Sequence, residues 1–195
     1  MSSVQTFYSI PDVTDPIKQG DIFKNIPLVF FDPRTLIKVE REKGSPFVSS
    51  TWLQEMGRDE ISVVVPVEPV LGIVASQDCD TQHREYVALF LVDKCHEVIG
   101  KDPPQKEEKQ KKWWIDRIVT DARCDQRWFY LPPASNVGFD EKMAANFSVV
   151  IPVLTEFLSE NLSALRIGRL NQEADEHFRE QIAQYYRRYP YDCLL

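Results

Sequence analysis

The chain has 195 residues, of which 43% are hydrophobic and 27% charged, and its formal net charge is -7. This length suits one domain, 1–195, with a core of its own, and the composition excludes a disordered chain. The negative charge disfavours general coating of nucleic acid, and no apolar run approaches the roughly 18 residues that cross a bilayer. The N-terminus lacks the regions of a signal peptide and the cysteines form no CxxC pair, so we expect a cytoplasmic protein with free thiols and no membrane partner.

The first strand is expected soon after a lead-in arm that covers residues 1–19. The run 22–31 is rich in β-branched and aromatic residues and lies between turn residues, which is typical of a strand. Pro27 lies within this run and has no amide proton, so the strand is interrupted there or lies at a sheet edge. The polar stretch 33–59 is interpreted as an insertion with one short strand, Phe47 to Trp52.

Short apolar runs rich in valine, isoleucine and aromatic residues predict further antiparallel strands. They are Ile61 to Val67, Pro69 to Ser76, Tyr86 to Val92, Trp128 to Leu131 and Phe147 to Val150. The segment 101–112 carries almost nothing to bury, which predicts a charged loop or the exposed start of a helix. We therefore expect a strand-rich part, 18–151, with roughly six or seven strands.

The remaining residues, 152–195, are expected to form a helical C-terminal extension of the same domain. Asn171 offers an N-cap, and acidic residues follow it where the positive end of a helix favours them. The residues whose helical spacing predicts one face packed on the sheet are Phe178, Ile182, Tyr185 and Tyr186. Pro190 ends the helix. The predicted fold class is therefore α+β, with an antiparallel sheet followed by an amphipathic helix.

The stretch that most suggests chemistry is Ser76 to Asp80, where an apolar strand runs into a polar loop. A plain turn is the alternative, because aspartate side chains cap their own backbone in turns. The candidate catalytic residues here are Asp78, Cys79, Asp80 and His83. Cys79 would be a nucleophile with His83 or His96 as its base, although the flanking carboxylates disfavour a thiolate.

Other chemistries compete for the same residues. In an extended segment Asp78 and Asp80 would face one side and could share a proton, but two carboxylates alone make no magnesium site. A zinc site would draw on Cys79, His83, Cys95 and His96. The adjacent pair Cys95-His96 is a poor chelate on a strand, where neighbours point to opposite faces. We therefore predict neither a bound metal nor a cofactor.

Arginine and aromatic side chains offer surfaces for binding. The candidates for contact with nucleic acid or a partner are Arg166, Arg169, Arg187 and Arg188, which a salt-paired helix face also explains. The tryptophans that could stack on bases, with core packing as the alternative, are Trp52, Trp113, Trp114 and Trp128. The aromatic C-terminal helix and the strand around Pro27 offer a protein interface.

The beginning of the chain resembles MazF/PemK-like proteins. The resemblance rests on Gly20-Asp21-Ile22 at the first strand, on Pro69 leading the strand VLGIVAS, and on the following strand YVALFLV. It covers about residues 18–94. It implies a small SH3-like β-barrel, usually dimeric, in a family that cuts single-stranded RNA within bacterial toxin-antitoxin systems.

The catalytic positions of that family are not matched here. Its arginine precedes the proline of the second motif, where this chain has Glu68, and its catalytic Thr or Ser falls near Asp93 and Lys94. A glutamate repels the charge that develops on a phosphorane. The turn Ser76 to Asp80 and the pattern Arg166 to Leu170 also look like a group of bacterial proteins related to this barrel, in a phage-defence context.

The resemblance therefore implies a divergent MazF/PemK-like module that binds or regulates without catalysis. Its partner would be an antitoxin-like protein or another component of a toxin-antitoxin or phage-defence system, and it would form a homodimer as the family does. One alternative is a metal-independent endoribonuclease toxin with a non-standard site, which acts on RNA. A second alternative is a cysteine- or zinc-dependent hydrolase.

Overall fold

The computed structural model describes residues 7–29, 37–38, 63–121 and 127–187. The chain divides into two compact units, one made of Met1–Ile26 with Val70–Leu195 and the other of Pro27–Pro69. The described part of the smaller unit contains a two-stranded antiparallel sheet of β3 (Ile37–Lys38) and β4 (Val63–Val64). The strand predicted from Phe47 to Trp52 lies outside the described residues.

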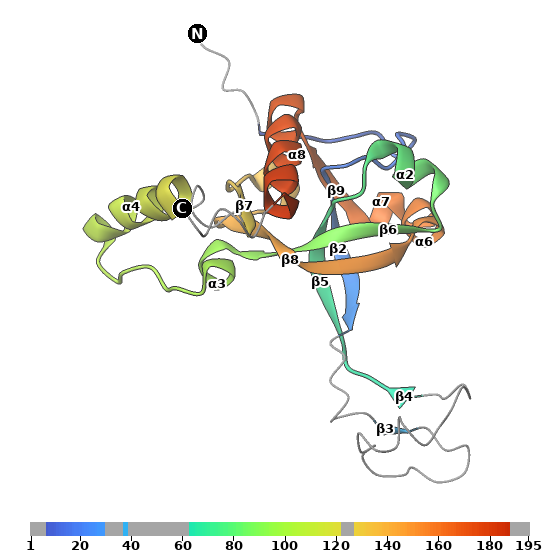
Figure 1. Ribbon diagram of the computed structural model, residues 1–195, viewed down its shortest axis with the longest axis horizontal. Coiled ribbons are helices and arrows are strands. Elements are labelled where there is room, and N and C mark those ends of the chain that lie inside the picture. Colours follow the sequence, from blue (N-terminus) through green and yellow to red (C-terminus); the bar gives the residue numbers. More distant parts are fainter. Residues whose placement is uncertain (1–6, 30–36, 39–62, 122–126, 188–195) are drawn as a thin grey trace. The chain divides into compact units, whose positions relative to one another are not determined.

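The larger unit is an α+β structure built on a seven-stranded antiparallel sheet (Figure 1). Its strands are β1 (Tyr8–Ser9), β2 (Asp21–Val29), β5 (Val67–Val74), β6 (Tyr86–Lys94), β7 (Trp128–Leu131), β8 (Met143–Leu154) and β9 (Arg166–Leu170). The last three residues of β2 and the first three of β5 fall within the smaller unit. They lie in the order β1-β9-β2-β5-β6-β8-β7. Because β1 and β7 end this order, the sheet is open.

Four of the predicted strands are confirmed, and a fifth lies within a longer strand. The single strand predicted from Ile61 to Val67 is wrong, because its described residues form only the two-residue β4 and Val67 already belongs to β5. β2, β5, β6 and β7 lie at the predicted places, and the strand predicted at Phe147 to Val150 is the middle of the longer β8. The lead-in arm is wrong in part, because Tyr8 belongs to β1 and is buried. β2 continues through Pro27. The pairing of β2 with β9 ends at Phe23, so the backbone of β9 requires no hydrogen bond from the position of Pro27, which has no amide proton.

The prediction of a wholly helical C-terminal part is also wrong. β9 lies within it and pairs on one side with β1 and on the other with β2. Its five residues include two arginines and a glycine, so no apolar run marks it as a strand. Gly168 is needed at its centre, because a Cβ there would lie 2.4 Å from Cγ1 of Val137.

Apart from α8, which packs on the sheet, the helices lie toward the two ends of β6 and β8. They are α2 (Asp78–His83), α3 (Cys95–Ile99), α4 (Glu107–Ile115), α6 (Thr155–Glu160), α7 (Leu162–Leu165) and α8 (Gln172–Tyr186), with a π-helix, η1 (Asp116–Asp121), and a 3-10 turn, η2 (Ser135–Val137). Figure 1 shows α2, α6 and α7 toward one end of these strands and α3 and α4 toward the other. Of the two alternatives for 101–112, a loop fits residues 101–106 and the exposed start of a helix fits the rest, because α4 begins at Glu107. No helix among the described residues is long and apolar enough to span a membrane.

The main core lies between the sheet and α8. Phe178 of α8 is fully buried, with its ring centre 5.1 Å from Phe129, 5.9 Å from Phe147 and 6.3 Å from Phe90. The predicted N-cap is confirmed, because the side chain of Asn171 accepts a 2.8 Å hydrogen bond from the amide of Ala174. Ile182 and Tyr185 also pack on this core, as predicted. Tyr186 was wrongly assigned to the buried face, since it is 62% exposed.

Side chains join the two edge strands of the open sheet. The hydroxyl of Tyr8 on β1 donates a 2.9 Å hydrogen bond to the carbonyl of Pro132, which directly follows β7. The ring of Phe7 lies 6.2 Å from that of Phe129 on β7, and Tyr8 lies 5.8 Å from Phe139. The sheet therefore curls until its edges meet through side chains rather than through backbone pairing.

The edge contact predicts a measurable loss in a Tyr8→Phe variant. This change leaves the carbonyl of Pro132 without its donor and should lower the free energy of unfolding by about 1 kcal/mol. Urea denaturation checks it, with Tyr86→Phe as the control because Tyr86 is 53% exposed. Equal stability of Tyr8→Phe and Tyr86→Phe would show that the hydrogen bond does not help to hold the edges together.

Candidate functional site

Two arginines of β9 meet a buried carboxylate at the start of β2. The carboxylate of Asp21 is fully buried, and it accepts from Nε and Nη2 of Arg169, the latter over 3.0 Å, and from Nη1 of Arg166 over 3.3 Å. The guanidinium groups also donate to the carbonyls of Asp15 at 3.0 Å and Pro16 at 2.7 Å. The sequence suggested a surface role for these arginines, but in the structure both are turned inward and hold β9 and the preceding loop to β2.

The stretch that carries the candidate catalytic residues is helical. The turn predicted from Ser76 to Asp80 is wrong, because α2 begins at Asp78 and continues to His83. Residues two apart on a helix do not face each other, so Asp78 and Asp80 do not form the carboxylate pair expected of an extended segment. This helix is hard to predict from sequence, because it has only six residues and its N-cap residue makes no side-chain hydrogen bond.

α2 is fixed to its surroundings by Asp78 and Thr81. Oδ1 of Asp78 accepts from the amide of Gln19 over 2.8 Å, and Oδ2 lies 3.4 Å from Nη2 of Arg179 on α8. The buried hydroxyl of Thr81 donates over 2.8 Å to the carbonyl of Ile17. Asp78 thus links three segments that are far apart in sequence.

A cavity of about 470 Å³ lies between α2 and α8, and we call it the α2–α8 groove. Its lining residues are Gln19, Ala75, Gln77, Asp78, Cys79, Arg179, Ile182 and Ala183. Ile182 and Ala183 of α8 are half-buried and form what we call its floor, whereas Gln77 and Cys79 are exposed and form its rim with the half-exposed guanidinium of Arg179. The groove can therefore hold an apolar side chain of a ligand and hydrogen-bond to polar groups beside it.

Beside the groove, Arg179 bridges two carboxylates. Its Nε lies 2.8 Å from Oδ2 of Asp175, one helical turn earlier, in addition to its contact with Asp78. Burial raises the pKa of Asp175, which Arg179 partly offsets and the negative charge of Asp78 increases further. Oδ1 of Asp175 is buried, and no group of the described residues hydrogen-bonds to it. The guanidinium is thus engaged mainly within the protein.

The remaining candidates on α2 lie at the surface. Cys79 is exposed, and its Sγ lies 3.9 Å from Oε1 of Gln77. Asp80 pairs with Arg84 at 3.4 Å, with both side chains largely exposed, and His83 is exposed at the end of the helix. Among the described residues, no hydrogen bond joins Cys79 to a histidine. The structure thus brings the candidates onto one helix without forming a nucleophile–base pair.

The cysteine and histidine that follow β6 do not form a metal site with them. Cys95 is fully buried, and burial raises the pKa of its thiol to about 12, so it stays protonated at neutral pH. Nε2 of His96 lies 3.8 Å from a carboxylate oxygen of Glu97. In the part of the chain that the structure describes, no three His, Cys, Asp or Glu side chains are grouped to hold a metal ion.

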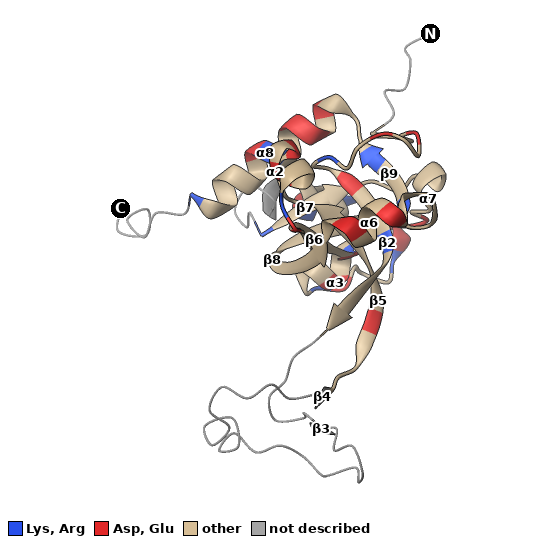
Figure 2. Ribbon diagram, turned by 90° about the vertical axis from the view of Figure 1, so that its right-hand side faces the viewer, with Lys and Arg blue, Asp and Glu red and all other residues tan. Residues whose placement is uncertain are grey.

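The other predicted binding residues are dispersed. Arg187 is exposed and follows α8, whereas Arg188 and Trp52 lie outside the described residues. Trp128 is a core residue at 2% exposure, and Trp114 is half-buried beside it. Figure 2 shows basic positions on β9 and acidic positions near the start of α8. Of the three candidate arginines that the structure describes, Arg166 and Arg169 are turned toward Asp21, and only Arg187 is exposed.

Some residues of the site were missed from the sequence. The i,i+4 spacing of Asp175 and Arg179 marks a helical ion pair, but the contact of Arg179 with Asp78 joins residues 101 positions apart.

A scan of family models, a search of curated proteins and a search of solved structures each find no match to this chain. The geometry of the α2–α8 groove is therefore the main support for a function.

Proposed function

We propose that the protein is a divergent MazF/PemK-like module that works by binding, as a regulatory component of a bacterial toxin-antitoxin or phage-defence system. The observation that carries this proposal is the state of the candidate catalytic groups. Asp78 accepts a hydrogen bond from Gln19 and pairs with Arg179, and Asp80 pairs with Arg84. Among the described residues, no histidine lies within hydrogen-bond reach of Cys79. Acid–base and nucleophilic catalysis need such groups within reach of one another.

The form of the sheet supports the proposed relation to the SH3-like barrel. β2, β5 and β6 are neighbours in the same order as in the sequence, as the resemblance implies for its three strands. The contact of Tyr8 with Pro132 brings together the two edges that a closed barrel would pair. We infer that the sheet is an opened relative of that barrel, with β9 and α8 added.

The residues at the catalytic positions of the family support a module without RNA cleavage. Glu68, at the position of the arginine, is an exposed residue of β5. The carboxylate of Asp93 accepts from the amide of Lys94 over 2.7 Å, and Nζ of Lys94 lies 3.0 Å from Glu141. None of these contacts provides a free cation for a phosphorane.

The α2–α8 groove is the proposed site for a protein partner. Ile182 and Ala183 offer an apolar floor, while Gln77 and Cys79 stand exposed at the rim, which matches the usual pattern of an apolar centre with a polar edge. Substitutions at exposed rim residues should change binding without changing stability. A rim variant that binds less but unfolds at the same denaturant concentration has therefore lost the interface and not the fold.

Light scattering coupled to size-exclusion chromatography tests the proposal, using the chain mixed with the products of its neighbouring genes. We expect the wild-type chain to form a complex that Cys79→Arg abolishes, since the longer side chain fills the groove. Gln82→Arg is the matched control, because Gln82 is exposed on the same helix and does not line the groove. A complex that survives Cys79→Arg, or no complex with any neighbour, would contradict the proposal.

One observation favours an endoribonuclease as the second candidate. Cys79 and His83 are four residues apart on α2 and both are exposed, so they lie on one face of the helix. RNA bound over this face would contact a thiol and an imidazole together, and the imidazole is a suitable general base. Cleavage that depends on His83 would favour this reading over the binding module.

A further inference from the structure

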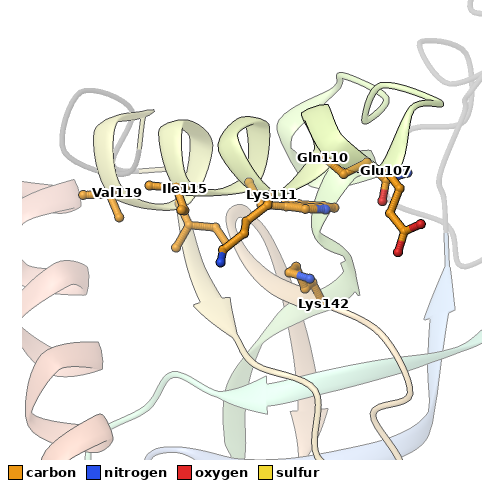
Figure 3. A pocket seen from close by; sticks show the side chains of 8 residues that line it. Glu107, Gln110, Lys111, Ile115, Val119 and Lys142 are labelled. Atoms are coloured by element: carbon orange, nitrogen blue, oxygen red, sulfur yellow. The ribbon is translucent and has the colours of Figure 1, made fainter.

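A second cavity lies along α4 and the π-helix that continues it, and we call it the α4 pocket (Figure 3). Its volume is about 440 Å³, and its lining residues are Glu107, Gln110, Lys111, Trp114, Ile115, Ile118, Val119 and Lys142. None of them lines the α2–α8 groove. Most recur every four residues, so one side of the helix forms the wall, and Lys142, which directly precedes β8, lies across from it.

The part of this wall from Trp114 to Val119 carries the apolar side chains and is incompletely covered. Ile115 is 52% and Val119 is 48% exposed, whereas Trp114 and Ile118 pack partly on the core around Trp128. Helical side chains of this kind normally face a core or a ligand. The described part of the chain leaves this wall open, with room for an apolar ligand along it.

Two lysines supply positive charge on one side of this wall. Nζ of Lys142 lies 5.0 Å from the ring centre of Trp114, and Figure 3 shows Lys111 pointing from the helix toward the side on which Lys142 lies. Within the described residues, neither ammonium group has a carboxylate at ion-pair distance, in contrast to Lys94, which pairs with Glu141. Unpaired cations beside an apolar wall, in a chain of net charge -7, are complementary to an amphipathic anion.

Glu107, at the end of the α4 pocket away from the apolar residues, determines how a ligand is oriented. Glu107 begins α4, one turn before Lys111, and its carboxylate repels an anion placed beside it. The apolar residues lie in the opposite direction, over the end of α4 and the π-helix. π-helical turns inside helices occur frequently at functional sites.

We propose that the α4 pocket binds a small amphipathic carboxylate. The carboxylate lies between Lys111 and Lys142, and the hydrocarbon chain runs along Trp114, Ile118 and Val119, away from Glu107. The volume of the pocket falls within the range of small-molecule sites, roughly 300–1,000 Å³. This site is separate from the proposed partner groove, so either can exist without the other.

Isothermal titration with hexanoate, octanoate and decanoate tests this site. Affinity should rise with chain length, because each added methylene is buried against the apolar wall. The double variant Lys111→Met with Lys142→Met should weaken decanoate binding by about tenfold or more, since two charge contacts are lost. Lys109→Met with Lys112→Met is the matched control, because it removes the same charge from the same region without altering the lining.

A decanoate affinity that is equal in the two double variants would overturn the proposal, because lysines inside and outside the pocket would then affect binding equally. The effect would come from net charge and not from contact of Lys111 and Lys142 with the carboxylate. Equal affinity for decanol would do the same, since the alcohol has the apolar chain and lacks the carboxylate. Absence of binding by all three carboxylates up to millimolar concentration would also refute it. Thermal unfolding of each variant checks that the fold is retained.

Discussion

Replacing Asp21 with asparagine should lower the free energy of unfolding by about 3–5 kcal/mol, the usual cost of breaking a buried ion pair from one side. Asp21 is fully buried and is the carboxylate partner of Arg166 and Arg169. Arg166 is itself only 3% exposed, so its guanidinium would keep its charge without water or a counterion. Urea denaturation followed by circular dichroism measures the loss.

Asp80→Asn is the matched control for this experiment. Asp80 also pairs with an arginine, Arg84, but these side chains are 46% and 73% exposed, so the pair contributes about 0–1 kcal/mol. If Asp21→Asn were as stable as Asp80→Asn, the buried pair would not be what fixes β9 to β2. The difference between two chemically identical substitutions thus reports the effect of burial.

Replacing Phe178 with alanine should cost about 3–5 kcal/mol, the usual range for a buried aromatic side chain. Phe178 is fully buried and contacts phenylalanine rings from β6, β7 and β8. The change would leave a cavity beneath α8 and should loosen the wall of the α2–α8 groove that this helix supplies. Thermal and urea denaturation measure the loss of stability.

Tyr186→Ala is the control on the same helix. Tyr186 is 62% exposed, and substitutions at such positions usually change stability by less than about 0.5 kcal/mol. A small effect of Phe178→Ala, similar to that of Tyr186→Ala, would contradict the placement of α8 on the sheet. A partner complex weakened by Phe178→Ala would link the position of this helix to binding.

Local sequence signals predicted the elements that depend on local physics. The strands that coincide with apolar runs between turn residues are β2, β5, β6 and β7, and α8 coincides with a segment that has an N-cap and one apolar face. Such signals act within a few residues of one another. They give the strands of the sheet and its main covering helix, but not the order in which the strands lie.

The elements that depend on distant residues could not be predicted in this way. β9 is a strand because Arg166 and Arg169 reach a carboxylate about 145 positions earlier and because the backbone pairs with β1 and β2. α2 has too few residues for a helical period to be visible, and its anchors are Gln19 and Ile17. The hydrogen bond between the two edges of the open sheet joins Tyr8 and Pro132, which are 124 positions apart.

In the candidate site too, the sequence predicts what depends on neighbouring residues and misses what depends on distant ones. The sequence identified Asp78 and Cys79 from their place at the end of an apolar strand, and both line the α2–α8 groove. It missed Arg179, because the contact that matters is with another element. It also selected Arg166 and Arg169 as surface residues, since side-chain burial of an arginine depends on a partner that sequence alone does not place.

The most direct test of the central claim is a time course of the purified chain with a long unstructured RNA, with magnesium or with EDTA. A MazF-type ribonuclease on the same RNA serves as the positive control, and circular dichroism shows that each sample is folded. A module that works by binding predicts RNA that stays intact in every lane with this chain. Specific cuts that disappear in Cys79→Ala or His83→Ala would contradict that claim and identify α2 as the site of a ribonuclease.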